Sequence, residues 1–350
     1  MRTIPIPFPG AVALLCLLAL GCPAPRPERR APPQSGPAAA SRSAASRTGS
    51  PTDRCDGRPC IQVGTFNAFW LGSKRRWDLP LRDAGEVRRI AAWLADDLDL
   101  EVIALEEVNT SVHGLEEGEL TFAPDRYRWL REALAERGYR LMAGESGNAQ
   151  RVVLAYDADE VELLSPAREL ETESFFDFGE ECRSAVRRPL AARLRAGSFD
   201  FWIVAVHLKS RREGECSDLI RRRQVEQMGL AIDRLLEGDG EGDVILSGDF
   251  NALPDDPTTA ALRSPGGFVE LTRRDRRAPG SGTVSYLIGE YASLIDHLMI
   301  RPATMAEWIA GSTVIYDPGR PSEESFHDYT SVFSDHAAVW TSFATDRDDD

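Results

Sequence analysis

The sequence lacks the motifs of several common kinds of site. Its six cysteines form no C-x-x-C pair and no cysteine–histidine spacing typical of zinc. It has no G-x-S-x-G turn, which argues against a serine hydrolase. There is also no internal repeat and, after the amino-terminal segment, no further change of composition. One large folded domain is therefore the simplest organisation of the 350 residues.

The chain also lacks the basic excess of proteins that attract nucleic acid through their overall charge. Its net charge is −15, and residues 1–54 contribute +5 from seven arginines and two acids, so the remainder carries −20. An acidic surface does not attract polyanions. If the substrate is a phosphodiester, a metal ion or a local arginine cluster must bring it in. The basic segment Arg273–Arg277 could supply such contacts, or it could be a flexible loop.

The amino terminus has the pattern of an export signal. Arg2 precedes an apolar run over 11–20 that is too short to span a bilayer, and small residues then lead to Cys22. This order resembles the lipobox of bacterial lipoproteins, with an ordinary secretory signal as the alternative. We expect residues 1–22 to be a signal peptide, lipidated at Cys22. The protein would then be extracytoplasmic and anchored to a bacterial membrane by lipid alone, or else secreted or periplasmic.

Composition divides the rest of the chain into a tether, a folded part and a tail. Residues 23–54 are rich in proline, alanine, serine and arginine and contain almost nothing to bury, which predicts a disordered tether. The folded domain is expected over 55–345. The last residues, 346–350, form an acidic tail.

Four cysteines lie in the folded part, an even number in an oxidising compartment. Four cysteines allow three pairings, and the sequence alone does not choose among them. The pairing that we favour joins Cys55 with Cys60 and Cys182 with Cys216.

Hydrophobic periodicity predicts more strands than helices. Because helices fall between groups of strands, we expect an α+β domain with two sheets packed face to face and helices outside, with a single mixed sheet as the alternative. Helices are predicted at 84–98, 127–137, 217–236 and 258–263. Strands are predicted at 61–67, 102–105, 139–143, 151–156, 161–164, 190–195, 199–207, 244–246, 293–300 and 337–343.

The segment 243–254, DVILSGDFNALP, presents an acid and an amide at the end of a buried strand. Asp249 and Asn251 are two residues apart, so on an extended backbone they face the same side, with Phe250 turned into the core. Gly248 lets the backbone come close to a ligand. The carboxyl end of a strand is where α/β architectures keep their chemistry. An Asx-type turn that caps the strand is the alternative.

Further polar residues occur where other apolar runs end, and they supply carboxylates, an amide and imidazoles. Ordinary alternatives exist, such as a turn residue at Asn67, a surface acid at Glu107 and a core histidine at His207. Oxygen-rich sites suit Mg²⁺, Mn²⁺ or Ca²⁺, and with a histidine they suit metal-assisted hydrolysis of a phosphoester. The residues are Asn67, Glu107 (with Glu106 as its rival), His207, Asp296, Asp335 and His336.

The order of these motifs resembles the endonuclease/exonuclease/phosphatase superfamily, which includes pancreatic deoxyribonuclease, abasic-site endonucleases, inositol polyphosphate 5-phosphatases and neutral sphingomyelinases. The similarity covers residues 61–343. It implies a deoxyribonuclease-like four-layer α/β sandwich with two mixed sheets, and a metal-dependent phosphoesterase. The segments that carry it are TFNAFW, IALEEV, VHLKS, SGDFNALP, LIDHLMI and SDHAAV.

The resemblance also assigns roles to the motif residues. Asn67, Glu107 and Asp335 resemble metal ligands, and Glu106 stands where the family has glutamine. His336 resembles the general base, with Asp296 on its other ring nitrogen. Other roles follow in the same way: Asp249 and Asn251 resemble the pair that orients water and stabilises the phosphorane, His207 resembles the histidine that contacts the phosphate or protonates the leaving group, and Arg187 (with Arg188 as its rival) and Lys209 resemble substrate-binding residues.

The implied activity is hydrolysis of a phosphoester by in-line attack of activated water, with Mg²⁺, Mn²⁺ or Ca²⁺ as cofactor. A monomeric extracytoplasmic nuclease is the first expectation. A phospholipid or inositol-phosphate phosphodiesterase or phosphatase is the second, although no exposed aromatic hairpin for lipid insertion is expected. A non-catalytic, metal-holding binding protein on the same scaffold is the third.

Overall fold

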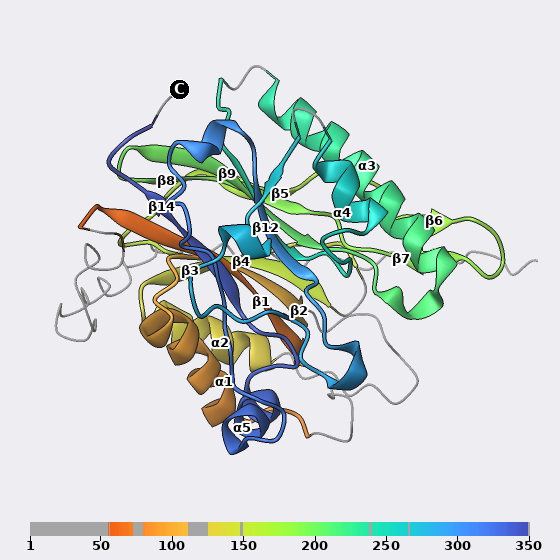
Figure 1. The fold of residues 1–350 in the computed structure, drawn as a ribbon, viewed down its shortest axis with the longest axis horizontal. Helices are drawn as coiled ribbons and strands as arrows, with labels where there is room; N and C mark the ends of the chain where they lie inside the picture. Colours follow the sequence, from red (N-terminus) through yellow and green to blue (C-terminus); the bar gives the residue numbers. More distant parts are fainter. Residues whose placement is uncertain are drawn as a thin grey trace, which may run out of the picture. The chain divides into compact units, whose positions relative to one another are not determined.

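Two mixed β-sheets form the body of the structure (Figure 1). The first has the strand order β13-β14-β1-β2-β4-β3 and the second the order β11-β12-β10-β9-β8-β5. The first sheet contains β1 (Cys60–Leu71), β2 (Val102–Val108), β3 (Tyr139–Ala143), β4 (Arg151–Asp157), β13 (Val314–Ile315) and β14 (Val339–Ala344). The second contains β5 (Glu162–Glu169), β8 (Leu190–Ala196), β9 (Phe199–His207), β10 (Val244–Asp249), β11 (Val269–Glu270) and β12 (Asp296–Ile300).

The computed structural model describes most of the expected domain. All described residues belong to one unit, Ser41–Asp350. The expected signal peptide, Cys22 and the tether lie outside the described residues. Within the described part, no helix has the length and hydropathy needed to cross a membrane. The described residues are 55, 57–72, 80–110, 125–147, 150–237, 240–264 and 267–348.

Helices cover the outer face of each sheet, so the domain has four layers (Figure 1). One outer layer contains α1 (Ala84–Ala92), which continues as a π-helical turn over Trp93–Asp97, together with α2 (Asp125–Ala135) and α5 (Glu324–Val332). The other contains α3 (Glu215–Leu236) and α4 (Pro257–Leu262). The predicted arrangement of two face-to-face sheets with helices outside is confirmed, and the single-sheet alternative is wrong.

Alternation along β9 shows how the sequence builds these layers. Phe201 and Ile203 belong to the core between the sheets, whereas Trp202 and Val204 pack on the side of α3. Because successive side chains of a strand point to opposite faces, a run that is apolar at every position must be buried on both sides. The apolar run over 201–206 of β9 is therefore buried on both faces of its sheet, between the other sheet and α3.

Each sheet contains one parallel pair of strands at its centre. In the first sheet β1 runs parallel to β2, and in the second β9 runs parallel to β10. Parallel neighbours end at the same edge of a sheet, so the four carboxyl ends bring their polar residues together. Asp296 begins β12 instead of lying inside a strand over 293–300, and its backbone pairs with that of Asp249.

Several short elements were not predicted. They include α5 and a small hairpin of β6 (Phe175–Asp177) and β7 (Arg183–Ala185). The α5 segment has only Phe326 and Tyr329 buried, which is too few apolar positions for a clear helical period. A two- or three-residue strand likewise leaves no period to detect.

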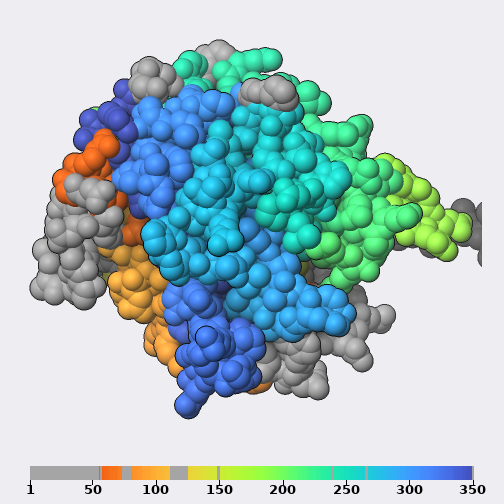
Figure 2. Space-filling model, in the orientation of Figure 1, coloured from red at the N-terminus to blue at the C-terminus, as the bar shows by residue number. Residues whose placement is uncertain are grey.

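The β6–β7 hairpin corrects one expectation. Phe175 and Phe178 are 54% and 44% exposed, so an exposed aromatic hairpin is present. The hairpin projects at the right of the space-filling view (Figure 2). The Cys182–Cys216 disulfide ties it to the start of α3, and a second disulfide joins Cys55 with Cys60.

Gly248 has a structural role that differs from the expected approach to a ligand. Its φ is +155°, and a Cβ there would lie 1.9 Å from the carbonyl oxygen of Val206 on the neighbouring strand. The glycine thus permits close pairing of β10 with β9.

Replacing this glycine should therefore destabilise the fold. We expect Gly248→Ala to lower the free energy of unfolding by about 3 kcal/mol or more, because the methyl group clashes with backbone. Gly229→Ala is the matched control: it lies in α3 with open space around its Cβ position and should stabilise by about 0.5–1 kcal/mol. Urea unfolding measures both. Equal midpoints for Gly248→Ala and the wild type would contradict the close approach.

Candidate functional site

The Asp249 carboxylate connects the two sheets at their carboxyl ends. Its Oδ2 accepts hydrogen bonds from Nδ2 of Asn67 at 3.2 Å and from Nδ2 of Asn251 at 3.1 Å, and its Oδ1 accepts from the Asn251 backbone N–H at 2.8 Å. His207 Nε2 lies 3.7 Å from Oδ2. Asn67 comes from β1 of the first sheet, while His207 and Asp249 come from β9 and β10 of the second. The acid and amide do lie together, but through the Asx-type turn that was the alternative interpretation and not through an extended backbone, because Asn251 lies beyond β10 with φ +50° and its backbone N–H donates to Asp249 Oδ1.

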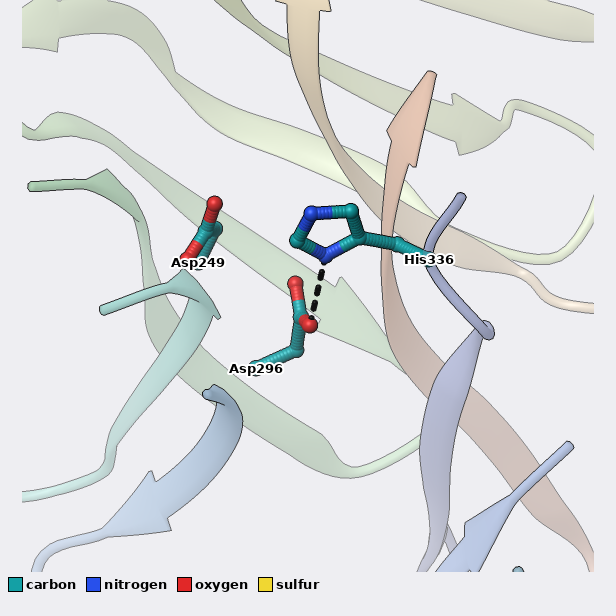
Figure 3. A group of neighbouring side chains, drawn as sticks. All are labelled: Asp249, Asp296 and His336. Atoms are coloured by element: carbon teal, nitrogen blue, oxygen red, sulfur yellow. Dashed lines mark hydrogen bonds and ion pairs between the residues drawn. The ribbon is translucent and has the colours of Figure 1, made fainter. Parts of the chain in front are cut away.

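His336 and Asp296 form a buried pair beside Asp249 (Figure 3). Nδ1 of His336 lies 2.8 Å from Oδ2 of Asp296. An ionised carboxylate only accepts, so Nδ1 carries the proton and Nε2 of a neutral imidazole is left with its lone pair. The ring of Tyr286 packs edge-on against His336, with centroids 5.1 Å apart. This arrangement fixes both the tautomer and the orientation of the imidazole.

Negative charge accumulates in this buried site. Burial, followed by the charge of Asp296, raises the pKa of the Asp249 carboxyl to about 7. Burial, followed by the same charge, raises the pKa of the Glu106 carboxyl well above its usual range. A bound cation would relieve this crowding of carboxyl groups.

The two histidines are shifted in opposite directions. Burial lowers the pKa of His336, but the carboxylates of Asp296 and Asp335 outweigh it and raise the pKa well above its ordinary value. Burial, followed by the charge of Arg187, lowers the pKa of His207 well below its ordinary value. His207 is therefore neutral at pH 7, whereas His336 takes up a proton readily.

The two adjacent glutamates at the end of β2 differ in their surroundings. Glu106 is buried, and its Oε1 accepts a hydrogen bond from the Thr65 hydroxyl at 2.8 Å. Glu107 is half-buried with φ +57°, and its Oε2 accepts from the Trp70 backbone N–H at 3.1 Å. The β1–β2 pairing shifts register between Asn67 and Leu71, so Glu107 lies at an irregularity of β2 where it has no partner residue on β1.

The segment before β14 is held by residues that the sequence did not single out. The Ser334 hydroxyl donates to the Asn67 carbonyl at 2.6 Å and accepts from the His336 backbone N–H at 3.0 Å. The Tyr329 hydroxyl donates to the His336 carbonyl at 2.8 Å. These bonds place the buried Asp335 and His336 beside the end of β1.

Arg82 is a second positioning residue that sequence reasoning missed. It is 2% exposed, and its guanidinium donates to the carbonyls of Phe69 (2.9 Å), Val332 (3.1 Å) and Phe333 (2.6 Å). Arg82 thus joins the end of β1 to the segment before Asp335. Only its position before a helix is visible in the sequence, where an arginine is usually exposed.

The expected substrate-binding residues lie in different surroundings. The Lys209 ammonium pairs with Glu213 at 2.7 Å. The backbone carbonyl of Lys209 accepts a hydrogen bond from Nη1 of Arg221 at 3.0 Å. Arg187 donates to Gln150. In the basic segment, Arg273 pairs with Asp255 at 3.3 Å on the surface.

Asp249, Asp296 and His336 could together hold a metal ion, since one ligand atom from each lies within 4.8 Å of the others. Among the described residues, this is the one group of three or more such side chains. Oδ1 of Asp296 and Oε2 of Glu106 are buried without a hydrogen-bond partner in the described part of the chain. Unpaired carboxylate oxygens fit a hard divalent cation, so the residues present suit the expected cofactor.

Several solved structures share the fold of this chain, although no protein-family model and no curated protein sequence matches it. An endonuclease/exonuclease/phosphatase family protein from Bacteroides thetaiotaomicron is 16% identical, with a TM-score of 0.56 over 81% of this chain and 94% of its own. TDP2 from D. rerio, complexed with a single strand DNA product, is 14% identical, with a TM-score of 0.55 over 82% of this chain and 99% of its own. A Bacteroides thetaiotaomicron mannosyl-6-phosphatase is 16% identical, with a TM-score of 0.54 over 81% and 99%. The deoxyribonuclease-like fold that the motifs implied is thus confirmed.

The unfolding free energy of the metal-free protein should depend on pH through the titration of Asp249 and His336. The pKa of Asp249 is about 7 in the folded state against about 3.9 unfolded. Its contribution to the unfolding free energy is therefore complete below about pH 4 and is lost as the pH rises to about 7. The raised pKa of His336 acts in the same direction at higher pH. In EDTA, the fall in unfolding free energy from pH 5 to pH 8 should be smaller in Asp249→Asn by roughly 2 kcal/mol. Glu226→Gln, on the exposed face of α3, should keep the wild-type fall, and an unchanged fall in Asp249→Asn would contradict the assignment.

Arg82→Met should remove the donor from one buried and two partly buried carbonyls. We expect a loss of about 3 kcal/mol in unfolding free energy, with Arg82→Lys recovering only part because an ammonium does not span the same fork. Arg128→Met, whose side chain is 55% exposed beside Asp125, should change it by less than about 0.5 kcal/mol. Urea denaturation compares the three variants. A similar small effect at both arginines would show that Arg82 does not hold the site segments.

Proposed function

We propose that the protein hydrolyses a phosphoester with a divalent cation by in-line attack of water. The hydrogen bond between His336 and Asp296, next to buried Asp249, carries this proposal. An imidazole oriented by one carboxylate and facing a second polar group is suited to activate water. The superfamily fold makes phosphoester chemistry the first choice for such a site.

The chain's own residues divide the steps among them. His336 in its neutral form accepts the water's proton at Nε2, and Asp296 stabilises the imidazolium through Nδ1–H. A bound cation would offset the carboxylate charges that raise the pKa of His336 and so would favour this neutral form. Asp249, held in place by the amides of Asn67 and Asn251, accepts a hydrogen bond from the attacking water and orients it. These groups are positioned before reaction, so little reorganisation is needed at the transition state.

His207 is better suited to the role of hydrogen-bond donor than to that of general acid. Its lowered pKa keeps the ring neutral at pH 7, so it can donate one N–H to charge developing on the phosphate. A leaving-group acid would need a raised pKa to be protonated at that pH. Of the two roles implied by the resemblance, contact with the phosphate is therefore the one that we retain.

Glu107, Asn67 and Asp335 would hold the cation, with Mg²⁺ as the first choice and Mn²⁺ or Ca²⁺ as alternatives. In this proposal the cation lies beside the group of Asp249, Asp296 and His336 and not on it, because a metal ion on His336 would remove the base. Bound there, the ion would neutralise phosphate oxygens and stabilise transition-state charge. The half-buried position of Glu107 favours it over fully buried Glu106 as a ligand. The charge of Glu107 contributes to the raised pKa of Asp249, which supports its proximity to the site.

For the substrate we propose nucleic acid, hydrolysed outside the cytoplasm by a monomer anchored through lipid at Cys22. The DNA product bound to the similar TDP2 structure supports a nucleic-acid substrate. Two disulfides in the structure fit an oxidising compartment. Arg273–Arg277 would add phosphate contacts that the acidic body lacks.

A phospholipid phosphodiesterase is the second candidate, and one observation favours it. Phe175 and Phe178 form an exposed aromatic hairpin, which is a feature that lipid surfaces bind. A non-catalytic binding protein would keep the cation site without turnover. Plasmid DNA, RNA, sphingomyelin and inositol phosphates, tested side by side with Mg²⁺, separate these candidates. Thermal stabilisation by Mg²⁺ or Ca²⁺ plus a nucleotide, without turnover on any phosphoester, would support the binder.

The base assignment predicts a specific loss of rate. With Mg²⁺ and bis-p-nitrophenyl phosphate, His336→Ala should lower kcat at least about 100-fold, the usual size of an acid–base contribution. Its matched control is His327→Ala, an exposed histidine of α5, which should keep the wild-type rate. Removing the cation with EDTA should abolish turnover. Wild-type kcat in His336→Ala would reject the base.

A further inference from the structure

Gln150 and Arg187 form a pair beside the site. Arg187 donates from Nη2 to Oε1 of Gln150 and from Nε to the Gln150 carbonyl at 3.3 Å. A guanidinium can only donate, so the carboxamide must turn its oxygen toward Arg187 and its nitrogen away. Gln150 is 8% exposed, and its Nε2 has no hydrogen-bond partner among the described residues. The pair therefore includes a buried amide donor that no described residue satisfies.

The described residues on either side of the gap at 148–149, between β3 and β4, pack against the Arg187 side chain. Gly147 has φ +83°, and a Cβ there would lie 2.6 Å from Cγ of Arg187. Arg151 donates to the Gly147 carbonyl, and Oε1 of Glu169 accepts from the Ser146 backbone N–H at 2.6 Å. This packing fixes the guanidinium, and with it the carboxamide of Gln150.

Arg187 lies within electrostatic range of the charged groups of the site. Burial lowers the pKa of Arg187, while the charges of Glu107 and Asp249 raise it. The charge of Arg187 in turn contributes to the lowered pKa of His207. Nδ1 of His207 is a second buried nitrogen without a partner in the described part of the chain. Positive charge and unpaired nitrogens therefore lie together in an otherwise acidic protein.

We propose that Gln150 and Arg187 form a subsite for a phosphate of the substrate, in which Nε2 of Gln150 donates to a phosphate oxygen. This rests on the proposed function and adds Gln150 to it. An unpaired buried donor is costly, and an anion supplies the missing acceptor. Adjacent guanidinium and amide N–H groups match the several oxygens of a phosphate. The subsite also supplies the local attraction for an anion that the net charge of −15 does not.

Binding of inorganic phosphate to the metal-free protein, measured by titration calorimetry, tests the subsite without any turnover. Gln150→Leu removes the donor at similar size, and Gln150→Glu places a carboxylate that pairs with Arg187 and repels phosphate. Both should weaken phosphate binding about 10-fold or more. Gln227→Leu, a glutamine of α3 that accepts from the Glu173 backbone N–H, is the matched control and should bind as the wild type does. Far-UV circular dichroism and the Tm of each variant confirm folding.

The outcomes separate the subsite from the proposed function. Wild-type affinity in both Gln150 variants, or no phosphate binding by the wild type, overturns the subsite. Binding that depends on Gln150, in a protein that hydrolyses no phosphoester, supports the subsite and rejects the function. If hydrolysis is found, Gln150→Leu should raise KM about 10-fold with a smaller change in kcat. An unchanged KM overturns the subsite while leaving hydrolysis standing.

Discussion

The hydrogen bonds accepted by the Asp249 carboxylate are the interaction on which the site depends. They join an amide from the first sheet to a strand end of the second, so the two sheets meet at one buried acid. Because an ionised carboxylate is costly to bury, its neighbours must supply donors or a cation. The two parallel strand pairs help to meet this constraint, since they bring the amide of Asn67 to Asp249. The adjacent Asp296 adds negative charge, which a cation would offset.

Backbone strain is concentrated around the same acid. Among the described residues, five that are not glycine have positive φ, and four of them border the site: Phe69, Trp70, Glu107 and Asn251. Such conformations persist only where surrounding contacts hold them. Arg82, Ser334 and the Asp249–Asn251 hydrogen bond provide these contacts. The hydrogen bonds therefore stabilise the strained backbone, and the strained backbone directs side chains toward the site that a regular strand would direct elsewhere.

Sequence reasoning succeeded where local pattern decides structure. The apolar run of β9 was enough to predict a buried strand, because alternation is a property of the strand itself. The meeting of Asp249 and Asn251 was predicted for the wrong reason, since Asn251 lies beyond β10 and an Asx-type turn joins the two residues. Gln150 and Arg82 could not be found in this way, since their roles come from contacts with residues distant in the chain. The hairpin carrying Phe175 and Phe178 was missed because its strands are too short to show a period.

The central claim is that these strand ends surround one cation and one phosphate. Crystals soaked with Mn²⁺ and inorganic phosphate, with anomalous diffraction recorded for the metal, test it most directly. The account predicts Mn²⁺ on Glu107 beside Asp249, with the phosphate between the ion and Nε2 of His336. Manganese bound elsewhere, with Glu107 and Asp249 free of it, would contradict the account.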